Sequence, residues 1–163
     1  MWAQAFEQIV QVLPAACQAV YGERLKSVAI YGSVARGTMR PDSDIDVLVV
    51  ADALAPSRAA RMDEFEQIDR VLADRIVAAR AAGVHTIVIP LLKTPEELRA
   101  GSLLYLDMTD QARILHDPEG ILRSYLDDLA QRLRAMGARR VPFGGSYYWE
   151  LKPDFRWGER IEL

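Results

Sequence analysis

Apolar side chains in the first twenty residues recur every three or four positions, the spacing of one face of an α-helix. They are Phe6, Ile9, Val10, Leu13, Cys17 and Val20. Pro14 lies inside this pattern, and proline removes a backbone donor and clashes with the preceding turn. We therefore expect a helix from Trp2 to about Tyr21, interrupted near Pro14 and ended by Gly22.

Three apolar, partly β-branched segments predict strands at 25–31, 45–50 and 84–92. Between the second and the third, apolar residues return to helical spacing. Ser57 is a plausible N-cap for this long helix, which runs to about Ala82. Strands alternating with helices favour an α/β fold.

The second half of the chain continues with short elements. Thr94 and Glu97 have capping-box spacing and predict the start of another helix. Residues 102–115 are expected to form a helix and then a strand, and an apolar stripe predicts a helix over 118–136. Residues 138–163 are rich in aromatic side chains and show no sustained period. We expect one domain over 1–137, with 138–163 as an ordered tail packed on it.

Composition narrows the classes of function. The chain has 163 residues, half of them hydrophobic, and a net charge of -3. A broad basic face is therefore not expected, so nucleic acid is an unlikely partner. No apolar run reaches the roughly 18 residues of a membrane span, and the single Cys17 suits a reducing compartment. These features predict a cytoplasmic protein without a membrane partner.

Asp44 and Asp46 are the first candidates for chemistry. They are two residues apart on an expected strand, so their carboxylates project from the same face. Two adjacent like charges repel each other unless a cation lies between them, and hard oxygen ligands favour Mg²⁺ or Mn²⁺. The pair therefore predicts a divalent metal site, although a water-exposed strand start would also explain it.

A second group of residues precedes the two aspartates by about ten positions. Gly32 and Ser33 follow the first strand and begin a short helical turn, where free backbone N–H groups can bind an anion. Arg36 and Arg40 add charged donors nearby. These four residues are candidates for phosphate binding, and Arg36 could equally fasten the loop to the sheet.

Together, Gly32-Ser33-Val-Ala-Arg36-Gly37 and Ser43-Asp44-Ile-Asp46-Val resemble the signature of the DNA polymerase β-like nucleotidyltransferase superfamily. The resemblance implies that Gly32 and Ser33 bind the triphosphate and that Asp44 and Asp46 hold the metal. It also implies the α/β fold of that family, a small mixed sheet with helices packed mainly on one face, and an active site at the sheet edge formed by the first two strands. The short chain is similar to minimal nucleotidyltransferases, some of which are antitoxins that modify HEPN ribonuclease toxins.

The family pattern also supplies a third carboxylate from a later strand, and the expected strand 84–92 contains no Asp or Glu. His85 is the candidate base there, since imidazole can exchange protons near neutral pH, although a structural role would also explain it. Glu96 and Glu97 are explained by the helix cap. Asp107 and Asp110 are expected to lie in an unfavourable position for reaching the site.

The predicted activity is transfer of a nucleoside monophosphate from Mg·NTP, with ATP as the expected nucleotide, to a hydroxyl group. The acceptor could be a protein side chain, a small molecule or an RNA end, and a HEPN-type toxin is the expected protein partner. The alternative is a nucleotide-binding antitoxin or regulatory module with weak or no catalysis, which acts by binding another protein. The missing carboxylate keeps both open, and a structural protein without a ligand is a third reading.

Overall fold

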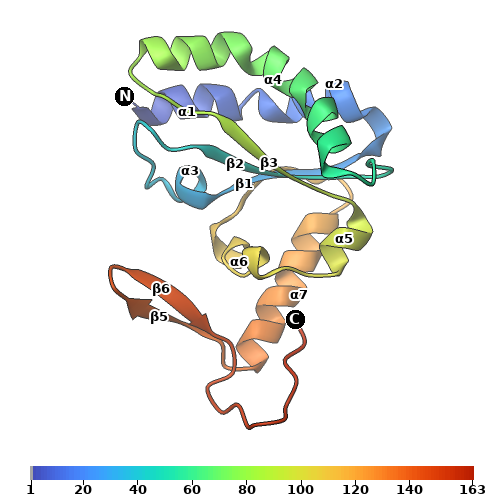
Figure 1. The fold of residues 1–163 in the computed structure, drawn as a ribbon, viewed down its shortest axis with the longest axis vertical. Coiled ribbons are helices and arrows are strands. Elements are labelled where there is room, and N and C mark those ends of the chain that lie inside the picture. Colours follow the sequence, from blue (N-terminus) through green and yellow to red (C-terminus); the bar gives the residue numbers. More distant parts are fainter. Residues whose placement is uncertain (1) are drawn as a thin grey trace.

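The computed structural model describes residues 2–163 and contains a four-stranded sheet between two layers of helices, with a separate hairpin near the C-terminus (Figure 1). The helices are α1 (Trp2–Val10), α2 (Leu13–Tyr21), α3 (Gly32–Arg36), α4 (Arg58–Ala81), α5 (Pro95–Arg99), α6 (Met108–Gln111) and α7 (Ile121–Ala135), with short 3-10 turns η1 (Gly22–Arg24) and η2 (Leu103–Tyr105). The strands are β1 (Leu25–Tyr31), β2 (Ile45–Ala51), β3 (Val88–Lys93), β4 (Arg113–His116), β5 (Arg139–Phe143) and β6 (Ser146–Glu150). The predicted α/β class with a small mixed sheet is confirmed.

The sheet has the strand order β3-β2-β1-β4. β1 pairs antiparallel with both β2 and β4, and β2 pairs parallel with β3. β1 and β2 are therefore the two central strands, so the expectation of a site at a sheet edge formed by these strands is wrong. Their pairing places Tyr31, at the end of β1, opposite Asp46, near the start of β2.

One face of the sheet is covered by α1, α2 and α4 (Figure 1). The break between α1 and α2 falls just before Pro14, as the sequence predicts. The hydroxyl of Ser57 accepts a hydrogen bond from the backbone N–H of Ala60 at 3.2 Å, which confirms the expected cap of α4. Phe6, Ile9, Val47, Phe65 and Ile68 are among the buried side chains of this core.

The opposite face is covered by α7 and by the shorter segment from α5 to α6 (Figure 1). Its core contains Leu48, Leu98, Tyr105, Leu122 and Leu126, all buried. Among residues 2–163, three of the four helices with nine or more residues (α1, α2 and α4) lie on the first face. The second face is therefore closed by one longer helix, α7, together with short elements, and the candidate site lies on that side.

The third strand begins later than the sequence predicts, at Val88 instead of Val84. The reason is that 84–87 pairs with the loop before β2. The N–H of His85 donates to the carbonyl of Pro41 at 2.7 Å, and the N–H of Ile45 donates to the carbonyl of Ile87 at 2.9 Å. This segment is therefore tied to the loop that carries Asp44.

The C-terminal hairpin of β5 and β6 was not predicted. Its strands pair antiparallel around Gly144 and Gly145. Both glycines have positive φ, which the tight turns of hairpins require. The Gly-Gly pair, followed by the aromatic run Tyr147 to Trp149, was a usable hairpin signal. No helix within residues 2–163 has the length and apolar character needed to cross a membrane.

Candidate active site

Asp44 and Asp46 flank Ile45, the first residue of β2. Ile45 is fully buried in the core beneath α1, α2 and α4, so the two aspartates project toward the other side of the sheet. Burial and the neighbouring charge of Asp44 raise the pKa of Asp46, while Arg36 lowers it. The carboxylates therefore lie close enough to repel each other, and one of them is partly desolvated.

Gly32 is required for the position of Asp46. Its φ is +70°, in the left-handed region, and a Cβ built there would overlap Asp46 Oδ2 and lie 3.3 Å from its Cγ. Any other residue would displace the carboxylate or the start of α3. The sequence argument assigned Gly32 to the approach of phosphate, and the structure adds this packing of the loop against the acidic pair.

Arg36, at the end of α3, faces the same region. Its Nη1 donates to Oε1 of Gln111 on α6 at 3.3 Å, and its charge acts on Asp46. Its contacts therefore combine a link between α3 and α6 with a positive charge beside the acidic pair, so both roles considered for it stay open.

Ser33 and Arg40 lie outside the pocket that contains Asp46. Ser33 is half-buried in α3, and its carbonyl accepts from the N–H of Thr38 at 3.0 Å. Arg40 is exposed in the loop between α3 and β2, where its N–H donates to the hydroxyl of Ser43 at 2.8 Å. Their phosphate-binding roles remain predictions.

A pocket of about 210 Å³ opens beside Asp46. It is lined by Tyr31, Gly32, Arg36, Asp46, Leu103, Leu104, Asp107, Met108 and Gln111. One side comes from the ends of β1, α3 and β2, and the other from η2, α6 and the residues between them. The pocket is below the roughly 300 Å³ at which most small-molecule sites begin, so it can enclose part of a nucleotide.

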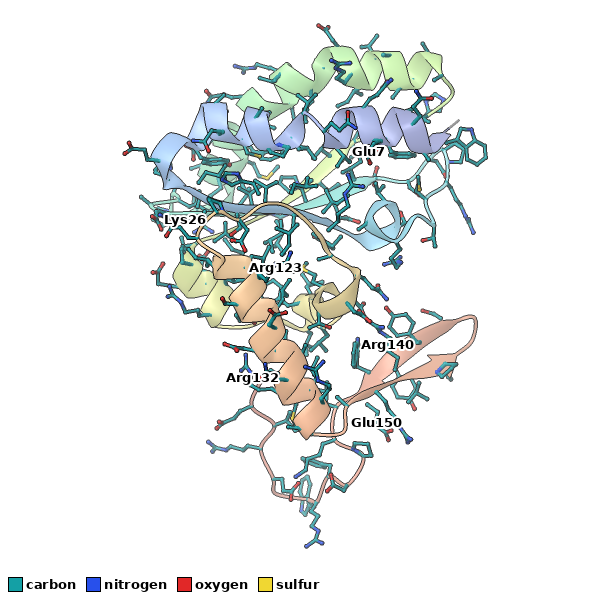
Figure 2. The ribbon with its side chains drawn as sticks, turned by 180° about the vertical axis from the view of Figure 1, so that it is seen from behind. Glu7, Lys26, Arg123, Arg132, Arg140 and Glu150 are labelled. Carbon is teal, nitrogen blue, oxygen red and sulfur yellow. The ribbon has the colours of Figure 1, made fainter. Side chains whose placement is uncertain are left out.

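Asp107 lies in this pocket, contrary to the expectation that its approach would be unfavourable. Its Oδ1 accepts hydrogen bonds from Trp149 Nε1 at 2.9 Å and from Arg140 Nε at 3.4 Å. Figure 2 shows Arg140 on the hairpin side that faces α6. Asp107 and the hairpin residues that hold it are the part of the site that sequence reasoning missed.

Arg140 is itself tightly held. Its two terminal nitrogens donate to the carboxylate of Asp110 at 2.9 and 2.6 Å, and its guanidinium packs over the rings of Tyr147 and Trp149. The Asp110 carboxylate raises the pKa of Arg140. Burial, followed by the Asp107 carboxylate, raises the pKa of Tyr147. The hairpin is therefore joined to α6 by a network of ion pairs and aromatic contacts.

The neighbouring strand offers no carboxylate at the level of the acidic pair. The parallel register places Ile89 of β3 opposite Asp46, and Ile89 is 40% exposed. His85, the predicted base, lies in the segment before β3 with an exposed side chain. The structure ties its backbone to Pro41, and its catalytic role remains a prediction.

The donor set fits a divalent cation that shares its ligands with a substrate. Within residues 2–163, three or more Asp, Glu, His or Cys side chains nowhere gather closely enough to hold a metal by themselves. Mg²⁺ is commonly bound by one or two carboxylates together with water and substrate phosphates. Asp44 and Asp46 match that pattern, and a cation there would relieve the repulsion that raises the pKa of Asp46.

Comparison with known proteins agrees with the motif. The family model described as a nucleotidyltransferase domain matches residues 9–102, more than half of the chain. The chain belongs to this family. The nucleotidyltransferase is 29% identical over 113 residues to a protein of Methanocaldococcus jannaschii whose name proposes a protein adenylyltransferase, covering 68% of this chain and 71% of that protein. The chain is therefore a transferase, as the sequence predicts.

Solved structures of toxin–antitoxin complexes also align with the nucleotidyltransferase. A chain of a complex with AMP-PNP is 19% identical, with a TM-score of 0.46 over 77% of this chain and 90% of that one. A chain of a complex between a tri-AMPylated Shewanella oneidensis HEPN toxin and its MNT antitoxin is 18% identical, with a TM-score of 0.40 over 83% and 91%. At TM-scores below 0.5, these likenesses carry no conclusion for this chain.

Proposed function

We propose that this nucleotidyltransferase transfers AMP from ATP to a hydroxyl group of a partner protein, with Mg²⁺ or Mn²⁺ held by Asp44 and Asp46. The close packing of Gly32 against Asp46 carries the proposal, because it joins the loop that starts α3 to the acidic pair. Family membership and the relative named as a protein adenylyltransferase support the reaction class and the protein acceptor.

Different residues of the site would bind the triphosphate and the cation. Gly32 and Ser33 would present backbone and hydroxyl donors to the triphosphate, and Arg36 and Arg40 would supply positive charge. Asp44 and Asp46 would hold the cation, which when bound neutralises phosphate charge and orients the triphosphate. Most of the catalysis would then come from positioning and charge neutralisation.

In the reaction, the acceptor oxygen forms a bond to the α-phosphorus of ATP. The bond from that phosphorus to the oxygen bridging to the β-phosphate breaks, and pyrophosphate leaves with the bonding electron pair. The acceptor proton passes to a base, for which His85 is our candidate, and then to water. Because β3 carries Ile89 opposite Asp46, we expect transfer to be slow.

The partner that we propose is a HEPN-type toxin, on the resemblance of the sequence motif to antitoxin nucleotidyltransferases. The test is mass spectrometry of the partner encoded beside this chain after incubation with the protein and Mg·ATP. A gain of one or more AMP groups, lost in Asp44→Asn with Asp46→Asn, is the expected result. If the double variant keeps the Mg·ATP affinity of the native protein, the assignment of the metal site is wrong.

The role of His85 has a separate test with the unmodified partner as the acceptor substrate. If His85 is the base, His85→Ala should lower the single-turnover rate by about 100-fold or more and leave nucleotide affinity unchanged. A fast reaction unaffected by His85→Ala would contradict both the slow chemistry and this role.

The position of Ile89 favours one alternative. A later strand without the carboxylate that the family pattern supplies fits a protein that binds nucleotide but transfers it weakly or not at all, and Ile89 is the residue of that strand opposite Asp46. Such a protein would neutralise its partner by binding alone. Co-purification with the partner, together with unmodified partner mass in the presence of Mg·ATP, would support this reading over the transferase.

A further inference from the structure

Asp107 has no function in the mechanism above, although it lines the pocket of Asp46. It lies in the chain beyond residue 102, where the match to the nucleotidyltransferase family ends. Among the described residues it also belongs to no group of three or more Asp, Glu, His or Cys side chains that could hold a metal ion. Its carboxylate therefore needs another explanation.

The two sides of the pocket differ in chemistry. Gly32 and Arg36 lie on the side of α3, where backbone donors and a positive charge suit phosphate. The opposite side contains Leu103, Leu104 and Met108 beside Asp107. Leu103 is 68% exposed and Leu104 is 57% exposed, although both line the pocket. Apolar walls with one fixed acceptor are typical of a site for a ring-bearing ligand with hydrogen-bond donors.

The carboxylate of Asp107 is oriented by residues far away in the sequence. Trp149 and Arg140 both donate to its Oδ1, and Tyr147 of the same hairpin lies close enough for the Asp107 carboxylate to raise the pKa of that phenol, after burial. The indole and the guanidinium also stack at 4.7 Å between Arg140 Cζ and the ring centroid. Because the donors are fixed by the hairpin, the carboxylate is held in one orientation before a ligand binds.

We propose that Asp107 anchors the nucleoside end of the bound nucleotide by accepting hydrogen bonds from it, and that Arg140 and Trp149 are positioning residues that hold Asp107 in place. The inference rests on the proposed nucleotide-binding function. A carboxylate repels phosphate, so the triphosphate extends toward Gly32 and Arg36, and the base or sugar lies against Leu103 and Leu104. The C-terminal hairpin thereby becomes part of the nucleotide site.

Two parts of ATP carry suitable donors, namely the ribose hydroxyls and the amino group of adenine. Both present an O–H or N–H to a carboxylate acceptor, which is the shared chemistry of the proposal. They are separated by comparing ATP with 2′-deoxy-ATP, 3′-deoxy-ATP and inosine triphosphate, which lacks the amino group. The analogue that binds less tightly identifies the donor that Asp107 accepts.

The central experiment compares two ligands, Mg·ATP and Mg·tripolyphosphate, by calorimetry. Asp107→Asn should weaken ATP binding by about 10-fold or more, the usual value of a hydrogen bond to a charged group, and leave tripolyphosphate binding unchanged. Asp46→Asn should weaken the binding of both ligands. Normal tripolyphosphate binding and an unchanged melting temperature would show that Asp107→Asn is folded.

The outcomes distinguish the inference from the function on which it rests. If the native protein binds neither ligand, the proposed function fails. If it binds both and Asp107→Asn binds ATP as tightly as the native protein, the inference is overturned. It is also overturned if ATP and all three analogues bind the native protein equally, because no donor would then be recognised.

The positioning residues are tested with matched variants of the same hairpin. Trp149→Phe removes the N–H donor to Asp107 and keeps an aromatic ring, and Arg140→Lys removes the planar donor geometry and keeps the charge. Each variant should weaken the binding of Mg·ATP without changing the binding of Mg·tripolyphosphate. Arg139→Lys is the control, because Arg139 pairs with Glu150 at 2.6 Å on an exposed part of the hairpin. An equal loss in the control would contradict the positioning role.

Discussion

The two faces of β2 differ in how they are covered. Ile45, Val47 and Val49 point toward α1, α2 and α4 and are fully buried. On the other face Leu48 and Val50 are buried beneath the second core, but Asp46 is only half-buried beside the pocket. On one face, therefore, all of these β2 side chains belong to the core. On the other face, Leu48 belongs to the core and Asp46, two residues earlier, belongs to the candidate site.

The difference shows how this fold creates a site. Long helices cover the first face. The second face is covered by α7 and, around Asp46, by short segments; we call this region around Asp46 the corner. Those short segments, α3, η2 and α6, line the pocket beside Asp46 without covering it, and the hairpin is joined to α6 through Arg140. Variants at the corner should therefore change ligand binding, and variants elsewhere should change stability alone.

The largest effect should come from adding a methyl group at the corner. Gly32→Ala would force the Asp46 carboxylate away from α3, since the new Cβ would occupy the place of Oδ2. A displacement of about 1 Å in a catalytic site can lower the rate about 100-fold, so we expect a loss of that order in the rate of AMP transfer, together with a weaker Mg·ATP affinity measured by calorimetry. Gly32→Val, with a larger branched side chain, should be at least as severe.

Gly37→Ala is the matched control. Gly37 ends α3 with a φ of +71°, nearly the same as Gly32, but a Cβ there would meet nothing within 4 Å. It should lower stability by about 1–2 kcal/mol through backbone strain and leave binding intact. If Gly37→Ala lowers Mg·ATP affinity as much as Gly32→Ala, strain and not the overlap with Asp46 is the cause.

A smaller effect is expected where the two faces are joined at the edge of β3. Arg61 of α4 donates to the carboxylate of Glu97 of α5 at 2.7 and 2.9 Å, and to the carbonyl of Leu92 at 3.1 Å. The Arg61 guanidinium lowers the pKa of Glu97 to about 2. A lowered carboxyl pKa adds stability that is complete above the unfolded value of 4.5 and is lost as pH falls toward about 2.

Glu97→Gln should therefore lower the free energy of unfolding by about 1 kcal/mol at pH 7, a value kept small because the Glu97 side chain is 40% exposed. Gln can still fill the capping box with Thr94, so the change isolates the ion pair. Urea denaturation at pH 7 and near pH 2 should show the difference disappearing at low pH. Glu96→Gln, at an exposed neighbouring position, should change little, and a pH-independent loss in Glu97→Gln would contradict the ion-pair explanation.

A third prediction concerns the cost of the acidic pair itself. Burial and Asp44 raise the pKa of Asp46 above 3.8, so without metal the fold loses stability as pH rises from 3.8 through the folded pKa. At pH 7, Asp46→Asn should therefore raise the free energy of unfolding of the metal-free protein by a small amount. With saturating Mg·ATP the native protein should be more stable than Asp46→Asn, because Mg·ATP binds and stabilises the native protein and not the variant. If Asp46→Asn is less stable than the native protein in EDTA, the charge of Asp46 does not destabilise the metal-free fold.

The parts of the molecule that follow local rules could be predicted from the sequence. Helical spacing, the caps at Ser57 and Thr94, and the break before Pro14 each depend on residues within one or two turns. Asp44 and Asp46 could be identified because alternation along a strand places them on one side. The family and the transferase class followed from the same short motif and are confirmed.

The remaining parts depend on contacts between distant residues. Asp107 meets Arg140 and Trp149 across 33 and 42 positions, and no local period relates these residues. The same limit explains why the first two strands were placed at a sheet edge. Local pattern identifies strands, whereas their order in the sheet depends on β3 and β4 flanking them.

The smallest effect is expected deep in the second core, beneath the corner. The hydroxyl of Tyr105 is buried and has no hydrogen-bond partner within residues 2–163, and burial raises the pKa of this residue to about 12. A buried polar group without a partner costs stability, so Tyr105→Phe should raise the free energy of unfolding by up to about 1 kcal/mol. The ring would keep its edge-on contact with Tyr125, whose centroid is 5.6 Å away.

Nucleotide affinity should stay unchanged in Tyr105→Phe, since Tyr105 points into the core and its neighbours Leu103 and Leu104 face the pocket. Denaturation and calorimetry on the same preparation provide the measurement. A variant that is more stable but binds Mg·ATP less tightly would show that core and corner are coupled through η2, and the separation drawn between the two faces would then fail.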